Sequence, residues 1–295
     1  MANTRVLVRR RKSVRNIRKI TRTMQLIATA RFQAAFNRAV ATRPYTAKIS
    51  ELVSELSRQA GEIEHPLLKV NQGADRSALL VITSNRGLCG GYNGNVLRIA
   101  MADRKDRQDA GETVDLHVVG KKGIGYLRFL RVETASRRPG MEDKPRYDEV
   151  DAIGQGFIDQ YSRGELDSVH VAYMRFYSAG RQRPELLQLL PIPRESEGEP
   201  ASAPVRTEAV EYEFSPEPKL LLGELLPASV KVRLFQCFMD AAVSEQVARM
   251  TAMKAATDAA RDTIKLLTRQ YNRARQTRIT MELLDILGGV EALKG

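Results

Sequence analysis

The residues best suited to chemistry lie in one glycine-rich run, Ser84-Asn85-Arg86-Gly87-Leu88-Cys89-Gly90-Gly91-Tyr92-Asn93-Gly94. The run follows a strand-like segment and precedes a helix-like one, where backbone N–H groups could bind phosphate. Its spacing matches neither GxGxxG nor GxxxxGK followed by Ser or Thr, and no acidic residue follows at the distance expected for a ribose contact. A tight structural turn is the favoured interpretation. A protein-contact loop and a nucleotide site are the alternatives.

Few side chains suit thiol, acid–base or metal chemistry. The sequence has 2 cysteines and 3 histidines. No histidine lies near Cys89 along the chain, so a small buried thiol is a better interpretation than a nucleophile. Cys89 and Cys237 are too far apart for a metal clip or a disulfide framework. His117 and His170 lie in apolar strand-like segments and are expected to be core residues. The sequence therefore predicts no catalytic residue, metal or cofactor.

The positive charge is concentrated at the N-terminus. The net charge is +12 over 295 residues, and residues 1–50 hold 13 Lys or Arg and no Asp or Glu. Such a segment suits an acidic protein, nucleic acid, an anionic membrane or the solvated face of a coiled coil. Phe32 and Phe36 are the only aromatic residues before Pro44, which leaves little for base recognition. An acidic protein partner is favoured over the other three.

Two long helices must position these residues. At the N-terminus, apolar residues recur every three or four positions, which predicts a helix over 1–61 with a bend or register shift at Pro44; the stripe is Val14, Ile17, Ile20, Met24, Ile27 and then Ala34 and Ala35. At the C-terminus, the stripe from Met253 to Ala274 has a mean spacing of 3.5, the coiled-coil period. This second helix, expected over about 227–287, would run roughly 90 Å and needs another long helix beside it.

Strand and helix patterns alternate between the two long helices. Strands are expected at 78–83, 114–119 and 169–177, with 186–190 pairing to the last, and helices at 93–109, 123–130 and 148–161. This alternation predicts a parallel-rich, Rossmann-like α/β domain. The predicted fold class is α/β plus a long antiparallel coiled coil. Its parts are an N-terminal shaft helix at 1–61, an α/β domain at 62–210, and a C-terminal helix at 211–295 that pairs with 1–61.

Three blocks of sequence resemble the gamma subunit of F-type ATP synthases. They are Ser13 to Met24, which fits K-x-I-T-x-x-M; Arg86 to Gly91, which matches RGLCGG; and Ser244 to Asp258, followed by Tyr271 to Gln276 and Ile279-Thr280. The resemblance runs from end to end of the chain. It implies the fold expected above, with the α/β domain at the foot of the coiled coil.

The resemblance implies that the chain is the central rotor shaft of such a synthase. In that role it would transmit rotation from the ion-driven membrane ring to three catalytic beta subunits, regulate ATPase activity and ion flow, and carry no chemistry itself. The implied partners are the alpha and beta subunits, epsilon and the membrane ring, and not nucleic acid. The basic helix opens the chain without a presequence, which favours a peripheral protein on the cytoplasmic face of a bacterial inner membrane.

The resemblance also assigns partner contacts to individual positions. The acidic lever of beta would be faced by Arg18, Lys19, Arg22 and Met24, and beta loops near the top by Arg275, Gln276 and Thr280. Cys89 would lie in a second contact with the lever, and the stretch from Tyr212 to Lys219 would form the ring-contacting foot. Asn85 and Ser215 stand where the family usually has acidic residues, so no acid-dependent contact is implied there. The regulatory cysteine pair of the chloroplast branch is missing, so thiol control is not expected.

Two hypotheses of other classes compete with the rotor shaft. One is a nucleic-acid-binding coiled coil with an accessory α/β domain, which would show steeply salt-dependent binding. The other is an α/β enzyme that binds a nucleotide at the glycine-rich run.

Overall fold

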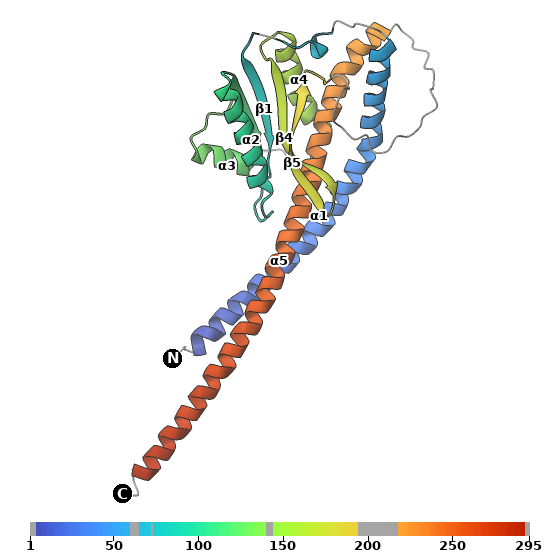
Figure 1. Ribbon diagram of the computed structural model, residues 1–295. Helices are drawn as coiled ribbons and strands as arrows, with labels where there is room; N and C mark the ends of the chain where they lie inside the picture. Colours follow the sequence, from blue (N-terminus) through green and yellow to red (C-terminus); the bar gives the residue numbers. More distant parts are fainter. Residues whose placement is uncertain (1–3, 60–64, 72, 140–143, 194–217, 293–295) are drawn as a thin grey trace. The chain divides into compact units, whose positions relative to one another are not determined.

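Along the chain, one long helix precedes the strands of a five-stranded sheet and a second long helix follows them. The computed structural model describes residues 4–59, 65–71, 73–139, 144–193 and 218–292 (Figure 1). The elements are α1 (Thr4–Gln59), the 3-10 helix η1 (Pro66–Leu68), β1 (Arg76–Ile82), α2 (Tyr92–Asp109), β2 (Thr113–Val119), α3 (Lys121–Phe129), β3 (Ser136–Arg138), α4 (Tyr147–Ser162), β4 (Ser168–Ser178), β5 (Arg181–Leu190) and α5 (Pro218–Ala292).

The chain divides into two units, and both long helices contribute to each. The paired-helix unit contains residues 1–30 and 249–295, and the sheet unit contains residues 31–248. The expected boundaries at 61/62 and 210/211 are sequence-based divisions, and they remain a prediction.

In the sheet unit, the strand order is β3-β2-β1-β4-β5. β1 pairs in parallel with both β2 and β4, β2 pairs in parallel with β3, and β5 is antiparallel to β4. The central strand β1 is buried along all of its length after Arg76. A strand buried on both faces is a continuous apolar run, which is how 78–83 was recognised in the sequence.

Helices cover both faces of the sheet, so the sheet unit has three layers (Figure 1). On one face Leu80 and Ile82 pack in a cluster with α4, the first third of α5 and part of α1. On the other face Leu79 and Val81 pack against α2. Successive residues of β1 thus alternate between the two cores, as the pleat requires.

In the paired-helix unit, α1 and α5 run antiparallel. The hydroxyls of Thr21 and Thr257 are in contact at 2.9 Å, and the Arg11 guanidinium lies 5.0 Å from the centroid of the Tyr271 ring. Residue numbers therefore fall along one helix as they rise along the other. The buried seam of α5 contains Met253, Thr257, Ala260 and Leu267, and that of α1 contains Leu7, Thr21 and Ala28. These positions keep the heptad spacing of a coiled coil.

The expected fold class is confirmed, but the seam of α1 differs from the predicted stripe. Ile17, Ile20 and Ile27 are 52%, 59% and 49% exposed, respectively. They lie away from α5, and the small residues at Thr21 and Ala28 face it instead. Small side chains allow the two helix axes to approach closely, so the residues that pair the helices are less apolar than those left outside. The prediction of that stripe was wrong for these three residues.

Two further expectations differ from the structure. α5 begins at Pro218, so Pro227 lies inside the helix and not at its start. The burial of Leu222, Leu226 and Val230 on the same face offsets the cost of about 3 kcal/mol for an internal proline. The short strand β3 was not expected. It has only three residues and lacks the apolar alternation of a longer strand.

Candidate functional site: a filled crevice and three exposed surfaces

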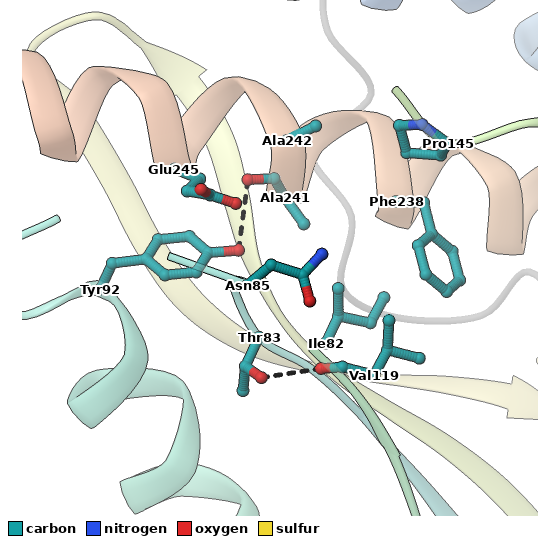
Figure 2. A pocket seen from close by; sticks show the side chains of 10 residues that line it. All are labelled: Ile82, Thr83, Asn85, Tyr92, Val119, Pro145, Phe238, Ala241, Ala242 and Glu245. Atoms are coloured by element: carbon teal, nitrogen blue, oxygen red, sulfur yellow. Dashed lines mark hydrogen bonds between the residues drawn. The ribbon is translucent and has the colours of Figure 1, made fainter. Parts of the chain in front are cut away.

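The crevice that would hold a ligand in this type of sheet is filled by the chain itself. In open α/β sheets, ligands bind at the carboxyl ends of the strands where the strand order reverses, which here is the end of β1 beside β4. Figure 2 shows this region, with Phe238, Ala241 and Glu245 of α5 beside Thr83 and Asn85. The remaining cavity is about 30 Å³. That space suits a water molecule, whereas small-molecule pockets occupy roughly 300–1,000 Å³.

Hydrogen bonds fix both sides of this crevice. The Tyr92 hydroxyl of α2 donates to the Ala241 carbonyl of α5 at 3.2 Å (Figure 2). The Thr83 hydroxyl donates to the Val119 carbonyl at 2.7 Å and accepts from the Gly123 amide at 2.9 Å. The Thr83 side chain thereby joins the end of β1 to the end of β2 and to the start of α3. The Tyr92 contact joins α5 to α2, and the crevice that remains beside α5 is too small for a nucleotide.

The glycine-rich run is closed by its own side chains. The Ser84 amide donates to Asn93 Oδ1 at 2.9 Å, and Asn93 Nδ2 donates to Ser84 Oγ at 2.8 Å and to Cys89 Sγ at 3.3 Å. The Ser84 hydroxyl donates to the Arg86 carbonyl at 2.7 Å. Cys89 is buried, and its thiol holds the turn together from the inside. The arrangement is the tight structural turn that the sequence favoured.

Asn85 has a structural role in this turn. Its Oδ1 accepts a hydrogen bond from the Lys121 amide, the first backbone N–H of α3, at 3.1 Å. A side-chain oxygen at this position satisfies one of the amides that a helix leaves unpaired at its N-terminus. Asn85 therefore supplies a helix-capping oxygen without a charge.

The two strand histidines are held neutral in the sheet. His170 Nε2 lies 2.9 Å from Arg107 Nη2, and because arginine can only donate, the imidazole proton must lie on Nδ1. Burial, followed by the charge of Arg107, lowers the His170 pKa to about 4. Burial also lowers the pKa of His117, whose Nδ1 lies 2.8 Å from Ser136 Oγ. Cys89 has Ser84, Arg86 and Asn93 as hydrogen-bond partners, and the expected core role fits both histidines.

The predicted contacts of α1 form an exposed basic surface on the paired-helix unit. Arg18, Lys19 and Arg22 are exposed and Met24 is half-buried. Arg22 Nη1 donates to Gln25 Oε1 at 3.1 Å, on the same helix. These side chains flank Thr21, which faces α5. The basic residues thus point away from the seam, where a partner could reach them.

The predicted contacts at the end of α5 form a second surface. Arg275, Gln276 and Thr280 are exposed, and the Thr280 hydroxyl donates to the Gln276 carbonyl of the same helix at 3.0 Å. Since Thr21 lies opposite Thr257, the surface around Arg275 is displaced from the basic surface by roughly 27 Å along the helix. The structure therefore does not bring the two predicted groups together.

The predicted foot lies almost entirely outside the described residues. Tyr212 and Ser215 fall in the segment 194–217, which the structure does not describe. Lys219 lies in the first turn of α5. The foot remains a prediction from sequence.

The structure adds exposed apolar residues that sequence reasoning missed. Ile17, Ile20 and Ile27 lie on the outer side of α1. The last turns of α5 expose a broad apolar face, and Arg278, Glu282 and Asp285 form a polar stripe on the remaining side. The apolar residues are Ile279, Met281, Leu283, Leu284, Ile286, Leu287 and Val290. An exposed apolar face of this width is normally buried by a partner. The signal was present in the sequence as an excess of apolar residues over what one helix–helix seam can bury.

Ionisable residues in the described part of the chain are not gathered into metal sites. No group of three or more His, Cys, Asp or Glu side chains there is arranged to hold a metal ion.

None of the described helices has both the length and the apolar character required to cross a membrane.

The fold and surfaces define a class of protein: a subunit built on an antiparallel pair of terminal helices, with an inserted α/β sheet whose ligand crevice is filled. The sequence model of the ATP synthase family matches residues 3–293. The ATP synthase gamma chain of Rhodopirellula baltica is 47% identical over 296 residues, covering 100% of both chains. That of Leptospira biflexa is 39% identical over 293 residues, covering 99% of this chain and 100% of the relative. The chain belongs to the ATP synthase gamma chain family.

Solved structures agree with the fold. A chain of the Euglena gracilis mitochondrial ATP synthase rotor matches with a TM-score of 0.63 at 17% identity, covering 94% of this chain and 98% of that one. A chain of the Tetrahymena thermophila mitochondrial ATP synthase central stalk and c-ring matches with a TM-score of 0.56 at 18% identity, covering 80% and 99%. At these identities the likeness establishes the arrangement of helices and strands.

Proposed function

We propose that this chain is the rotating central shaft of an F-type ATP synthase and that it carries no catalytic residue. The observation that supports this most directly is the last stretch of α5. Its apolar side chains from Ile279 to Val290 form a broad exposed face. α1 is described from Thr4, and its contacts with α5 include Arg11 over the Tyr271 ring. An apolar face that no other described part of the chain covers suits a surrounding sleeve of other subunits.

The basic surface of α1 supports a second contact with the head. Arg18, Lys19 and Arg22 project from the paired helices, in a segment that has 13 basic and no acidic residues over 1–50. Such a surface complements an acidic lever on beta. Charge complementarity of this kind contributes more to orientation and encounter than to net affinity, because desolvation offsets much of the attraction. Arg275, Gln276 and Thr280 would add polar contacts near the sleeve.

Rotation would act on the catalytic sites through differences in contact. A shaft with different surfaces on different sides stabilises a different conformation of each beta subunit at each angle, and the coupling free energy is the difference between those contacts. Control of ATP hydrolysis and ion flow would follow from the same contacts. The filled crevice beside α5 supports the non-catalytic role, because its remaining cavity of about 30 Å³ is too small for a nucleotide.

The proposed partners are the alpha and beta subunits, epsilon and the membrane rotor ring, with the stretch from Tyr212 to Lys219 at the ring. The proposed location is the cytoplasmic face of the bacterial inner membrane, as a peripheral subunit. A mixed assembly of this kind needs no helix in this chain that crosses the membrane.

Assembly tests the proposal. The full chain is co-expressed with the alpha and beta subunits of the same source, and the complex is purified through a tag on beta. We expect a single gamma chain with three alpha and three beta subunits, and ATP hydrolysis only when beta is present. A second arm uses the chain shortened after Gln276, which removes the whole apolar end of α5 from Ile279 to Val290.

The outcomes are distinct. A stable complex that loses torque or assembly in the shortened form supports the shaft. Failure of the full chain to co-purify with alpha and beta contradicts it, as would nucleotide turnover by the isolated chain. Full coupled activity of the shortened form would contradict the role assigned to the end of α5.

A further inference from the structure

The side of α3 that faces away from the sheet carries aromatic and basic side chains. Phe129 is 83% exposed, more than any other large apolar side chain among the described residues, and Tyr126 one turn earlier is 44% exposed. On the opposite side of the helix, Ile124 and Leu127 are buried against Val118 of β2. A helix that covers a sheet normally combines such a buried face with a polar outer one. The outward side of α3 therefore has an apolar centre that the packing of the chain does not explain.

Helical geometry gathers these exposed residues into one surface. At about 100° per residue, Phe129 lies within roughly 20° of Lys122 and 60° of Tyr126 around the helix axis, and roughly 160° from the buried Leu127. Lys121 and Arg128 border this stripe and are exposed as well. The α3 outer face is defined here by five residues: Lys121, Lys122, Tyr126, Arg128 and Phe129.

Positive charge surrounds the two aromatic side chains. Residues 121–138 contain six Lys or Arg and a single carboxylate, that of Glu133. Within the part of the chain that the structure describes, none of these six cations takes part in an ion pair. The Arg138 carbonyl of β3 accepts a hydrogen bond from the Gly120 amide, directly before α3, at 3.1 Å. The exposed Arg137 and Arg138 of the edge strand therefore extend the basic area around the start of α3.

A groove between α2 and α3 adjoins the α3 outer face, because Lys122 and Tyr126 belong to both. Its volume is about 570 Å³, and its lining consists of Asn93, Gly94, Leu97, Arg98, Met101, Lys122 and Tyr126. The Asn93 amide is already bonded to Ser84 and Cys89. The groove therefore offers an apolar floor and two cations, without a carboxylate. That combination suits a phosphate group attached to an apolar chain.

The residue types favour a lipid surface over a structured protein partner. Apart from the Tyr126 hydroxyl and the Arg128 guanidinium, the α3 outer face has no group for directional hydrogen bonds. Lysine acts as a mobile point charge, and Phe129 has no polar atom. Proteins recognise bilayers in this way: aromatic and apolar side chains enter the boundary of the acyl chains, while Lys and Arg attract anionic headgroups.

We propose that the α3 outer face docks on an anionic lipid bilayer. Phe129 enters the acyl boundary, Tyr126 lies at the level of the headgroups, and the three cations of the face contact headgroup phosphates. This contact goes beyond the proposed function, which brings the chain to the membrane only through the rotor ring. One inserted aromatic side chain with a few cations binds reversibly, and mobile lipids impose no fixed angle. The contact is therefore compatible with a rotating subunit.

A single introduced tryptophan tests insertion, because the chain has none of its own. Phe129→Trp in the full chain is mixed with vesicles of phosphatidylcholine and phosphatidylglycerol whose acyl chains carry bromine, a contact quencher of tryptophan. The matched control is Tyr177→Trp, at an exposed aromatic residue between Arg175 and Arg181. We expect strong quenching at position 129, little at position 177, and little at either with phosphatidylcholine alone.

The readout must be local, because the basic segment 1–50 can itself attract the chain to anionic vesicles. Quenching reports only the surroundings of the tryptophan, so this attraction alone does not produce a difference between the two positions. Absence of quenching at position 129, or equal quenching at positions 129 and 177, would overturn the proposal.

Removal of charge tests the headgroup contacts. Lys121→Gln and Arg128→Gln are added together to the Phe129→Trp chain, and the matched control adds Lys254→Gln and Lys265→Gln, which remove two exposed cations from α5. Each basic residue at an anionic surface changes the partition constant roughly fivefold. We expect the α3 pair to raise the lipid concentration for half-maximal quenching roughly twentyfold, and the α5 pair to leave it near the parental value. Equal shifts would show general attraction of a basic chain and contradict docking by this face.

Assembly without lipid separates a bilayer from a protein partner. In a complex of the Phe129→Trp chain with alpha, beta and epsilon subunits, we expect the tryptophan to stay accessible to acrylamide, a quencher dissolved in the water. Shielding by those subunits would mean that a protein covers the α3 outer face, and the proposal would be wrong. If the parental chain does not assemble with alpha and beta while position 129 still inserts into vesicles, the proposed function fails and the lipid contact stands.

Discussion

The hydroxyl groups of Thr21 and Thr257 lie 2.9 Å apart, both buried, and join the two long helices across 236 positions of sequence. Each hydroxyl also contacts a carbonyl of its own helix, that of Arg18 at 3.2 Å and that of Met253 at 2.8 Å. The pair is therefore the polar centre of an otherwise apolar seam.

Replacing one member of this pair should destabilise the paired helices moderately. Thr21→Val keeps the shape of the side chain and removes one hydroxyl, so we expect a loss of about 1 kcal/mol in the free energy of unfolding. The double variant Thr21→Val with Thr257→Val should lose less than the sum of the single variants, because no buried hydroxyl is left without its partner. Urea denaturation followed by circular dichroism measures both. The control is Thr29→Val, whose exposed hydroxyl bonds only to the Gln25 carbonyl.

A glycine pair tests the junction at Thr83. In Gly120→Ala, the new Cβ would lie 2.1 Å from the Thr83 carbonyl oxygen, at a φ of +97°. The backbone cannot yield without breaking the β1–β2 junction, so we expect a loss of several kcal/mol. Gly111→Ala has nearly the same φ, +92°, and nothing within 4 Å, and should lose only about 1 kcal/mol. Melting temperatures of similar size for the two variants would contradict the steric account.

Mild acid should lower the free energy of unfolding, because His170 binds a proton in the unfolded chain before it does so in the native protein. The native pKa is about 4, and in the unfolded chain it is about 6.5. Between these values the unfolded state binds a proton that the native state does not, so the free energy of unfolding falls as the pH falls. The expected loss from this residue is about 2 kcal/mol by pH 5. It is fully regained above pH 6.5.

His170→Gln isolates that contribution. Glutamine can still accept a hydrogen bond from Arg107 but does not titrate in this range. The loss of stability between pH 7 and pH 5 should therefore be smaller in the variant than in the parent. His117 and His65, whose pKa values are also lowered by burial, remain in both proteins and cancel in the comparison. Equal slopes would show that His170 is protonated in the native state.

The thiols of the native chain should be unreactive. Cys89 and Cys237 are both buried, and burial raises the pKa of Cys237 to about 12. Since the thiolate is the reactive species, a disulfide reagent at pH 8 should release almost no product until denaturant is added, and then two equivalents per chain. Rapid reaction of one equivalent in the native state would contradict the inward orientation of Cys89.

A cation added beside the basic surface should disturb coupling. Met24→Lys adds a charge on the side of α1 that holds Thr21 and Ala28. Under the proposed function the added charge would strengthen attachment to the acidic lever, so the rotor should resist release at each step. We expect fewer ions pumped per ATP hydrolysed, with normal assembly. Thr23→Lys adds the same charge one position earlier, at an exposed residue turned by about 100° around the helix, and should have a smaller effect. Parental coupling in Met24→Lys would remove Met24 from the contacts.

The parts of the fold that could be predicted from sequence are those with one dominant signal. The strand 78–83 is an unbroken apolar run, and the α5 stripe through Met253, Ala260 and Leu267 keeps the heptad period and is buried. Both signals are set by burial within the chain itself. The parallel character of the sheet followed from the alternation of strands and helices, whereas the strand order β3-β2-β1-β4-β5 was not predicted.

The α1 seam could not be predicted because apolar periodicity does not say which partner covers it. Ile17 and Ile20 fit the helical period as well as Thr21 and Ala28 do, and they are more apolar. In the candidate site, the resemblance pointed to Cys89 because the residue lies in the run that matches RGLCGG. The sequence also predicted a buried thiol, which the structure confirms, but not its hydrogen bond from Asn93 Nδ2.

The distance in sequence between Thr21 and Thr257 has a consequence for synthesis. A ribosome that adds roughly 5–20 residues per second makes the partner of α1 some tens of seconds after α1 itself has left the exit tunnel. During that interval Leu7 and Ala28 have no α5 to pack against and are exposed to solvent. Ile17, Ile20 and Ile27 on the outer side of α1 are exposed as well. The nascent chain therefore exposes these apolar side chains, which are prone to aggregate, for longer than a chain whose helix partners are adjacent in sequence.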